Sequence, residues 1–334
     1  MRPREAVIET RELTKKYGKF VALRGLNLSV ERGEILGFVG PNGAGKTTTI
    51  KILVGLARPT SGSARVAGAD CVTEARRIKR LVGYMPDTFG SYDNMRVAEY
   101  LDFFGAAFGI PRRERLRRID ESLETAGAGT FKDLFVEALS HGMKQRVAIA
   151  RTLLHDPAVL VMDEPANGLD PQARIEMRQV LLDLADRGKT LLVTSHVLPE
   201  LARVCHRFAI IARGKLQAMG TLEEISRQLH QLRPMEVLLT DAGQVGRAAE
   251  VVRQYVETGA EITAVPAEAS VRFRTARREE DLAGLLAALV RAGVGVAQYR
   301  EVATDLEEAF MTIALETSPE RERLGKGPVA GAPG

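Results

Sequence analysis

The sequence predicts an α/β fold built around a parallel sheet, followed by a smaller α+β domain. Short, continuous apolar runs are typical of strands that are buried on both faces of a parallel sheet. Such runs occur at residues 34–40, 158–162 and 190–194 of the 334-residue chain. Segments with helical spacing lie between these runs, and strands that alternate with helices indicate an α/β sheet. The pattern changes after residue 231, which predicts a second domain there.

The first part of the chain predicts half-buried strands. Residues 5–13 and 21–30 alternate apolar and polar positions, which is typical of a strand with one face in the core. After the first buried run we expect a helix at 47–56. A strand at 63–67, and another that ends at Pro86, complete this part.

Residues 94–155 predict a helical subdomain inserted into the α/β sheet. Apolar side chains recur there at helical spacing, as in Val97, Leu101 and Phe104. Pro111 is expected at the first position of a further helix, where its missing N–H costs nothing. The sheet then resumes with elements at 158–162, 171–184, 190–194 and 207–211.

The predicted second domain covers residues 232–316, which leaves 1–231 for the first domain. Its expected strands lie at 235–240, 269–275 and 294–300, and its expected helices at 244–257, 279–291 and 304–315. Residues 317–334 are rich in glycine, proline and charge, so we expect a disordered tail.

Composition excludes several classes of protein. The formal net charge is +4 with acids and bases mixed, which argues against a nucleic-acid partner. Cys71 and Cys205 give neither a disulfide framework nor metal-ligand spacing, and a reducing cytosol fits them. No stretch approaches the roughly 18 apolar residues that a membrane helix needs. We therefore expect a cytoplasmic protein whose membrane work, if any, depends on another polypeptide.

One motif predicts nucleoside triphosphate binding. A G-x-x-x-x-G-K-[ST] pattern opens a helix directly behind an apolar strand. Glycines allow successive backbone N–H groups to point at a phosphate, and the helix N-terminus adds partial positive charge. We expect Lys46 to reach the β- and γ-phosphates and the Thr47 hydroxyl to ligate Mg²⁺, with Thr48 as a further phosphate contact. The residues of the loop are Gly40, Pro41, Asn42, Gly43, Ala44, Gly45, Lys46 and Thr47.

Further motifs identify a family. In chain order they are Tyr17 before the phosphate loop, then Leu139–Gln145, Val159–Glu164, Gly168–Asp170 and Thr194–His196 after it. With the loop, they resemble the ATP-binding cassette (ABC) family over about the first 220 residues. The resemblance implies a phosphate-loop NTPase fold: a RecA-like core with an antiparallel β part and a helical subdomain.

The resemblance also implies roles for the aromatic and catalytic-strand residues. Tyr17 would stack on adenine. Asp163 resembles the Walker B aspartate that holds Mg²⁺, and Glu164 the adjoining glutamate that orients or deprotonates water. His196 resembles the switch histidine that donates to the γ-phosphate. The positions of Asp163 and Glu164 at the end of an apolar strand fit these roles.

A second copy of the chain is implied by the signature motif. In the family, Ser140 and Gly142 would face the ATP held by the other subunit, and Asp170 would belong to the D-loop beside it. A helix N-terminus with small residues is a suitable anion site. One chain carries one cassette, so the resemblance implies a head-to-tail homodimer with ATP and Mg²⁺ as cofactors.

Two residues depart from the family pattern. His141 stands where the signature usually has glycine, and it either tunes closure on the opposing phosphate or points outward. Asp87 stands where the family usually has a glutamine that touches Mg²⁺ and connects to the membrane partner. Aspartate is shorter and charged, so it could ligate the metal directly, with altered coupling.

The transporter branch is inferred from resemblance as well. Residues 85–94, 97–101 and 304–310 look like those of drug, sodium and polysaccharide exporter ATPases, which act with a separate membrane permease. We expect the permease to dock on residues 87–110, where Phe89 or Tyr92 would either suit a groove or form core. The expected location is the cytoplasmic face of the membrane. The alternatives are an ABC importer subunit and a soluble ABC ATPase without transport.

Overall fold

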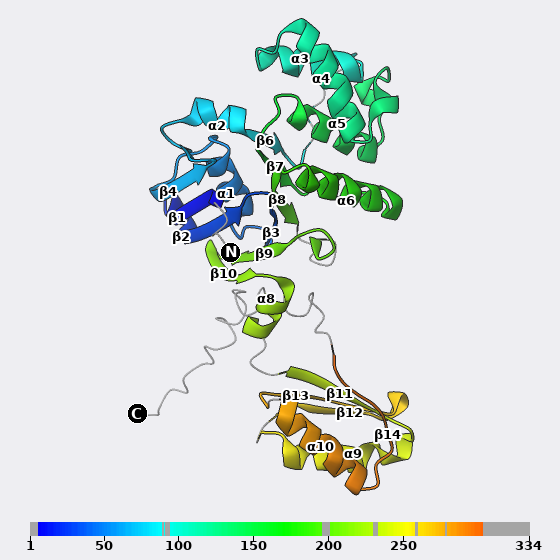
Figure 1. Cartoon of the computed structure of the whole chain (residues 1–334). Helices are drawn as coiled ribbons and strands as arrows, with labels where there is room; N and C mark the ends of the chain where they lie inside the picture. The colour runs from blue at the N-terminus through cyan, green and yellow to red at the C-terminus, as the bar shows by residue number, and fades with distance from the viewer. Residues whose placement is uncertain are drawn as a thin grey trace, which may run out of the picture. The chain divides into compact units, whose positions relative to one another are not determined.

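The computed structural model describes residues 6–88, 90, 94–195, 201–229, 233–257, 260–277 and 279–302. The contacts divide this part of the chain into two compact units, at Leu222 and Glu223 (Figure 1). The break lies at the start of helix α8 (Leu222–Leu229). The expected domain boundary at 231, the expected helix at 304–315 and the expected tail at 317–334 lie outside the described residues.

An antiparallel sheet opens the first unit. Its strand order is β2-β1-β4-β5, and Tyr17 pairs with Phe20 across the turn between β1 and β2. Both of these strands extend further than the alternating pattern predicted. The pairing of β1 shifts register between Thr10 and Leu13, and Glu12 has φ 46°, so a bulge ends the strict alternation early. The bounds are β1 Ala6–Tyr17, β2 Phe20–Glu31, β4 Ser61–Val66 and β5 Ala69–Asp70.

The predicted parallel sheet is present. Its order is β10-β9-β3-β8-β7-β6, with only the β9–β10 pair antiparallel. Strands β3, β7 and β8 are buried at every residue, which explains their continuous apolar sequences. The bounds are β3 Ile35–Val39, β6 Val82–Met85, β7 Val159–Asp163, β8 Thr190–Ser195, β9 Arg207–Ala212 and β10 Lys215–Gly220. The helices between them are α1 Lys46–Leu53, α2 Ala75–Leu81 and α6 Pro171–Asp186.

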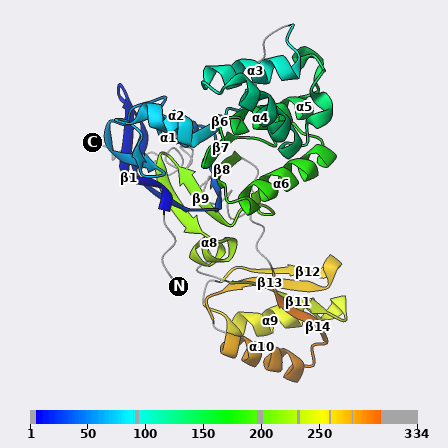
Figure 2. The same cartoon turned by 45° about the horizontal axis from the view of Figure 1, so that its top comes forward.

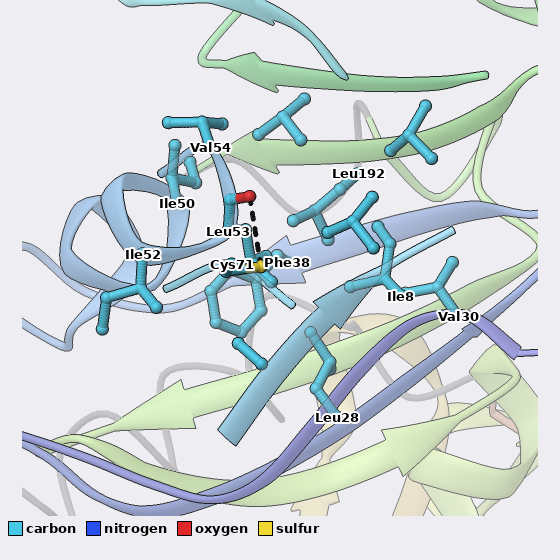
Figure 3. Packing of buried hydrophobic residues seen from close by; sticks show 14 of the residues in the cluster. Ile8, Leu28, Val30, Phe38, Ile50, Ile52, Leu53, Val54, Cys71 and Leu192 are labelled. Carbon is cyan, nitrogen blue, oxygen red and sulfur yellow. Dashed lines mark hydrogen bonds between the residues drawn. The ribbon is translucent and has the colours of Figure 1, made fainter. Parts of the chain in front are cut away.

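The core of this unit joins the antiparallel sheet, the parallel sheet and α1. Figure 3 shows Ile8 and Leu28 of the antiparallel sheet packed in one cluster with Phe38 of β3 and Ile50 of α1. The Cys71 thiol lies in the same cluster, 3.5 Å from the Leu53 carbonyl oxygen. Burial and the nearby Asp70 carboxylate raise the pKa of this thiol to about 12. This packing fixes β3 and α1 on either side of the phosphate loop.

The helical segment lies at one end of the parallel sheet (Figures 1 and 2). It contains α3 Val97–Ala107, α4 Arg112–Thr125 and α5 His141–Leu153, with short 3₁₀ turns at Gly129–Phe131 and Val136–Ala138. Pro111 was expected to be the first helical residue of α4, but it is the N-cap instead. Its ψ of 143° is extended, and its carbonyl accepts the first helical bond, from the Arg115 N–H. No helix in the described part of the chain is both long and apolar enough to cross a membrane.

The second unit is an α+β domain with a β-α-β-β-α-β order. Its sheet order is β12-β13-β11-β14 with every pair antiparallel, which is the ferredoxin-like arrangement. The sequence pattern missed β12 because its residues are exposed or half-buried at the sheet edge. The unit has its own hydrophobic core, in which Val237, Val252 and Leu285 are buried. The bounds are β11 Arg233–Leu239, α9 Val245–Tyr255, β12 Ile262–Val265, β13 Ser270–Thr275, α10 Glu279–Arg291 and β14 Val296–Glu301.

Candidate functional site

A cavity of about 270 Å³ lies where the phosphate loop meets the carboxyl ends of the parallel strands. Parallel strands end at one edge of a sheet, so β3 and β7 deliver their following residues to the same place. The cavity is therefore a product of the strand order. Its lining residues are Phe20, Ala22, Pro41, Asn42, Gly43, Gly45, Lys46, Thr47, Thr48, Asp87, Asp163 and Glu164.

The phosphate loop is shaped by its glycines. Gly45 has φ 115°, a conformation that L side chains rarely adopt. A Cβ on Gly40 would lie 2.3 Å from the Ile211 carbonyl oxygen, so only glycine fits against β9 there. Helix α1 follows directly, and its N-cap makes no side-chain hydrogen bond. The N–H groups of its first turn therefore suit an anion.

Lys46 is the buried cation of the cavity. It is only 7% exposed, and its Nζ donates to the carbonyl oxygens of Gly40 at 2.5 Å and Pro41 at 3.4 Å. Burial lowers the pKa of Lys46 from its ordinary value, and the nearby carboxylates of Glu164 and Asp163 act in the opposite direction. Phosphate oxygens would add the negative charge that a buried ammonium needs.

Asp163 and Glu164 are fixed by a residue that the sequence analysis did not single out. The Thr194 hydroxyl donates to Asp163 Oδ1 at 2.6 Å and accepts the Glu164 N–H at 3.0 Å. Glu164 has φ 54°, which is strained for a residue with a side chain. A signal was present, because Thr194 lies near the end of a buried strand as the first residue of the motif Thr194–His196. His196 itself lies outside the described residues.

Asp87 reaches the cavity from the end of β6. It lines the cavity together with Asp163 and Glu164, as expected for a residue near the metal. The Asn167 side-chain amide donates to Asp87 Oδ1 at 3.4 Å. Burial, with the Asp163 and Asp87 carboxylates nearby, raises the pKa of Tyr84 to about 12, so this phenol stays protonated beside them.

The remaining expected nucleotide contacts lie elsewhere in the unit. Tyr17 is 48% exposed with the Lys15 ammonium 4.9 Å from its ring centre, whereas Phe20 lines the cavity. Ser140 is the N-cap of α5, and its Oγ accepts the Met143 N–H at 3.3 Å.

The other two expected nucleotide contacts are Gly142 of the signature motif and Asp170 of the D-loop. Gly142 follows Ser140 in the first turn of α5. Asp170 is the N-cap of α6 and accepts the Ala173 N–H at 2.9 Å. Ser140, Gly142 and Asp170 are not among the described residues that line the cavity of their own phosphate loop.

A glycine-rich loop between β3 and α1, with an acidic residue at the end of β7, which β8 separates from β3 in the same sheet, defines a phosphate-loop nucleotide-binding protein. Comparison with known proteins narrows this class. Residues 23–167 match the family described as "ABC transporter".

Relatives and solved structures agree on the family. The chain is 40% identical over 226 residues to the "Probable multidrug ABC transporter ATP-binding protein YbhF" of Escherichia coli K12, and the match covers 68% of this chain but 39% of that protein. It is 34% identical over 308 residues to the "Nod factor export ATP-binding protein I" of Cupriavidus metallidurans, covering 92% and 97%. The chain therefore belongs to the ABC transporter ATP-binding family.

The structural neighbours are cassettes of the same family. The "Structure of ATP binding subunit of ABC transporter" has a TM-score of 0.61 and 32% identity, covering 66% of this chain and 92% of that one. A dimeric post-hydrolysis structure of MJ0796 bound to ADP and phosphate has a TM-score of 0.58 and 27% identity, covering 64% and 98%. The predicted cassette fold is confirmed by these neighbours.

Proposed function

We propose that this chain is the ATP-binding and ATP-hydrolysing subunit of an ABC transporter and powers a separate membrane permease. The observation that carries the proposal is the cavity where the uncapped start of α1, the Lys46 ammonium and the carboxylates of Asp163 and Glu164 converge. Donors on one side suit a triphosphate, and carboxylates on the other suit a metal ion and an attacking water.

The proposed nucleotide contacts divide by chemistry. Backbone N–H groups of the phosphate loop and the Lys46 ammonium bind the phosphates, because both supply donors without negative charge. Thr47, Asp163 and Asp87 hold Mg²⁺, since hydroxyl and carboxylate oxygens are its preferred ligands and all three residues line the cavity. When bound, the ion neutralises phosphate charge. Tyr17, across the β-turn from Phe20, is our proposed adenine contact.

Hydrolysis is assigned to the residues beyond β7. Glu164 orients the attacking water and accepts its proton, which is general-base catalysis. The Thr194 hydroxyl bonded to the Glu164 N–H keeps the backbone of that residue in place. We propose that His196 donates to the γ-phosphate and that Lys46 stabilises the charge that develops during transfer.

We propose that two copies form a head-to-tail dimer with ATP between them. The start of α5 carries Ser140 and Gly142, and neither they nor Asp170 line the cavity of their own phosphate loop within the described chain. They remain available to an ATP held by a second copy. The dimeric structure of the MJ0796 cassette supports this assembly.

A second cavity suits the permease. About 350 Å³ of mostly apolar space lies between the helical segment and the end of α1. Leu56 and Phe108 are exposed at its edge, and Phe104 lies beside them. A short amphipathic helix of a membrane subunit would bury these side chains. Phe89 and Tyr92, which the sequence also suggests for this contact, lie outside the described residues.

We propose export as the direction of transport and the cytoplasmic face of the membrane as the place of work. The support is that relatives are named for multidrug and Nod factor export. An importer subunit or a soluble ABC ATPase is the alternative. Vesicles that contain this chain and its membrane permease distinguish these options. ATP-driven movement of substrate in the import direction, or no movement, would contradict export.

The nucleotide chemistry is tested with two variants of the purified chain. Lys46→Ala should abolish binding of a fluorescent ATP analogue, because the loop loses its only side-chain ammonium in the cavity lining. Glu164→Gln should bind ATP normally and hydrolyse it about 10²–10⁴-fold more slowly, the range for loss of a general base. Normal affinity of the first variant, or rapid turnover by the second, would contradict these roles.

A further inference from the structure

We propose that His141 and Asn167 are positioning residues that connect the start of α5 to Asp87. The inference deepens the proposed function and rests on it, because the start of α5 is the part of the chain proposed to face the partner's ATP. Asp87 lines the cavity of the chain's own ATP. The connection would therefore make the two nucleotide contacts of one chain respond to each other.

Asn167 contacts both residues at which this chain departs from its family. His141 Nε2 lies 2.8 Å from the Asn167 carbonyl oxygen, and the Asn167 amide donates to Asp87 Oδ1 at 3.4 Å. The Asn167 N–H in turn donates to the Glu164 carbonyl oxygen at 3.1 Å. One residue thus joins the signature helix, the proposed metal ligand and the proposed catalytic glutamate.

The contact fixes the proton on the His141 ring. A carbonyl oxygen can only accept, so Nε2 must carry the hydrogen and donate. The Gln145 amide also faces His141 Nε2, at 3.4 Å from Gln145 Nε2, and two donors cannot pair. Gln145 is buried, and its Oε1 has no hydrogen-bond partner among the residues that the structure describes.

Turning the Gln145 amide over resolves this conflict. The amide orientation is an assignment that the hydrogen-bond network must decide. With the oxygen toward the imidazole, the Nε2 hydrogen of His141 is shared between Gln145 and the Asn167 carbonyl. The ring is then held at Nε2 by two acceptors, which restricts its rotation as a positioning residue requires.

The neighbouring glycine leaves the room that this ring occupies. Gly168 has φ +69°, and a Cβ there would lie 3.3 Å from His141 Nε2. The usual glycine of the signature has no side chain to reach Asn167, so the connection belongs to chains with a donor at position 141. The His141 side chain is exposed, and this contact turns its ring toward Asn167.

The test uses ATP-driven dimerisation of the full chain carrying Glu164→Gln, measured by analytical ultracentrifugation against Mg-ATP concentration. His141→Gly should weaken the dimer about tenfold, from roughly threefold for one exposed hydrogen bond in each of the two subunits, and should therefore raise the half-maximal ATP concentration about threefold, because each dimer holds two ATP. His141→Gln keeps a side-chain N–H and should restore most of the loss. ATP affinity of the isolated subunit should stay the same in both variants.

A double-mutant cycle separates connection from local damage. Asn167→Ala removes the bond to Asp87 in both subunits and should likewise weaken the dimer by about tenfold, and combining it with His141→Gly should cost less than the product of the single effects. Gln172→Ala serves as control, since this exposed α6 residue donates to Glu176 Oε1 at 2.9 Å, away from His141, Asn167 and Asp87 in the hydrogen bonds of the described chain. Urea unfolding midpoints show that all variants remain folded.

The outcomes also separate this inference from the proposed function. Multiplicative effects of the two substitutions, or equal behaviour of His141→Gly and His141→Gln, would overturn the connection while ATP binding stands. A parent chain that binds ATP without dimerising would overturn the connection and the dimer but leave nucleotide binding intact. A parent chain that does not bind ATP would refute both proposals.

Discussion

Replacement of Thr194 by valine tests how the catalytic carboxylates are held. Thr194 is fully buried, and its hydroxyl bonds to both residues of the proposed catalytic pair: it donates to Asp163 Oδ1 at 2.6 Å and accepts the Glu164 N–H at 3.0 Å. Valine has nearly the same shape but no hydroxyl. The substitution therefore removes two hydrogen bonds without opening a cavity.

The expected loss of stability follows from these two bonds. A hydrogen bond to a charged group contributes about 1.5–3 kcal/mol, and a buried N–H left without a partner costs about 1–3 kcal/mol. Thr194→Val should lower the free energy of unfolding by about 3 kcal/mol. Turnover should fall as well, because the strained backbone of Glu164 loses the hydrogen bond from its N–H to the Thr194 hydroxyl.

Two comparisons make the assay specific. Urea unfolding and steady-state ATPase rates are measured for Thr194→Val, Thr194→Ser and Thr190→Val. Thr190 lies at the start of the same strand, is equally buried and accepts the Gly33 N–H at 3.0 Å. Thr190→Val should lose stability but keep its turnover, and Thr194→Ser should keep its turnover and lose only about 1 kcal/mol for the buried methyl group. An unchanged stability of Thr194→Val, or equal turnover losses at both positions, would refute the reasoning.

Two other predictions concern Glu164 and His155. Glu164→Gly and Glu164→Ala should both stop hydrolysis, but the glycine variant should be more stable by about 1 kcal/mol, because φ 54° penalises any side chain; equal urea midpoints would contradict this strain. Burial, opposed by the Val82 carbonyl, lowers the pKa of His155, whose ring stacks on Phe108 at 4.0 Å. The unfolded chain then binds more protons, so stability should fall as the pH drops below about 6.5. His155→Phe should remove that dependence in thermal melts between pH 5 and 8, and parallel curves for both proteins would contradict it.

The fold could be predicted where burial shapes the sequence strongly. Strands β3, β7 and β8 are buried along their whole length, so their apolar runs are unmistakable. Prediction failed where local geometry breaks the pattern. The bulge after Thr10 hid residues 14–17 of β1, and the partly exposed edge strand β12 shows no alternation. Backbone irregularity and edge exposure are consequences of pairing that a single segment does not encode.

The site shows the same division between local and long-range information. The phosphate loop is a contiguous motif, so the sequence alone locates Lys46 and its glycines. The role of Thr194 depends on β7 and β8 pairing so that Asp163 lies opposite Thr194, which follows from the register of two distant segments. The contact of Asn167 with Asp87 joins residues 80 positions apart and requires the completed sheet.

The short loop between β7 and α6 explains why both nucleotide contacts depend on one stretch of chain. Its first residue, Glu164, is bonded to Thr194, and its last, Asp170, caps α6 through the Ala173 N–H. Asn167 lies between these two fixed ends and bonds to Asp87 and His141. A loop of this length with both ends fixed cannot shift at one contact without straining the other. Substitutions within it should therefore change turnover and dimer closure together, whereas substitutions in the phosphate loop should act first on ATP affinity.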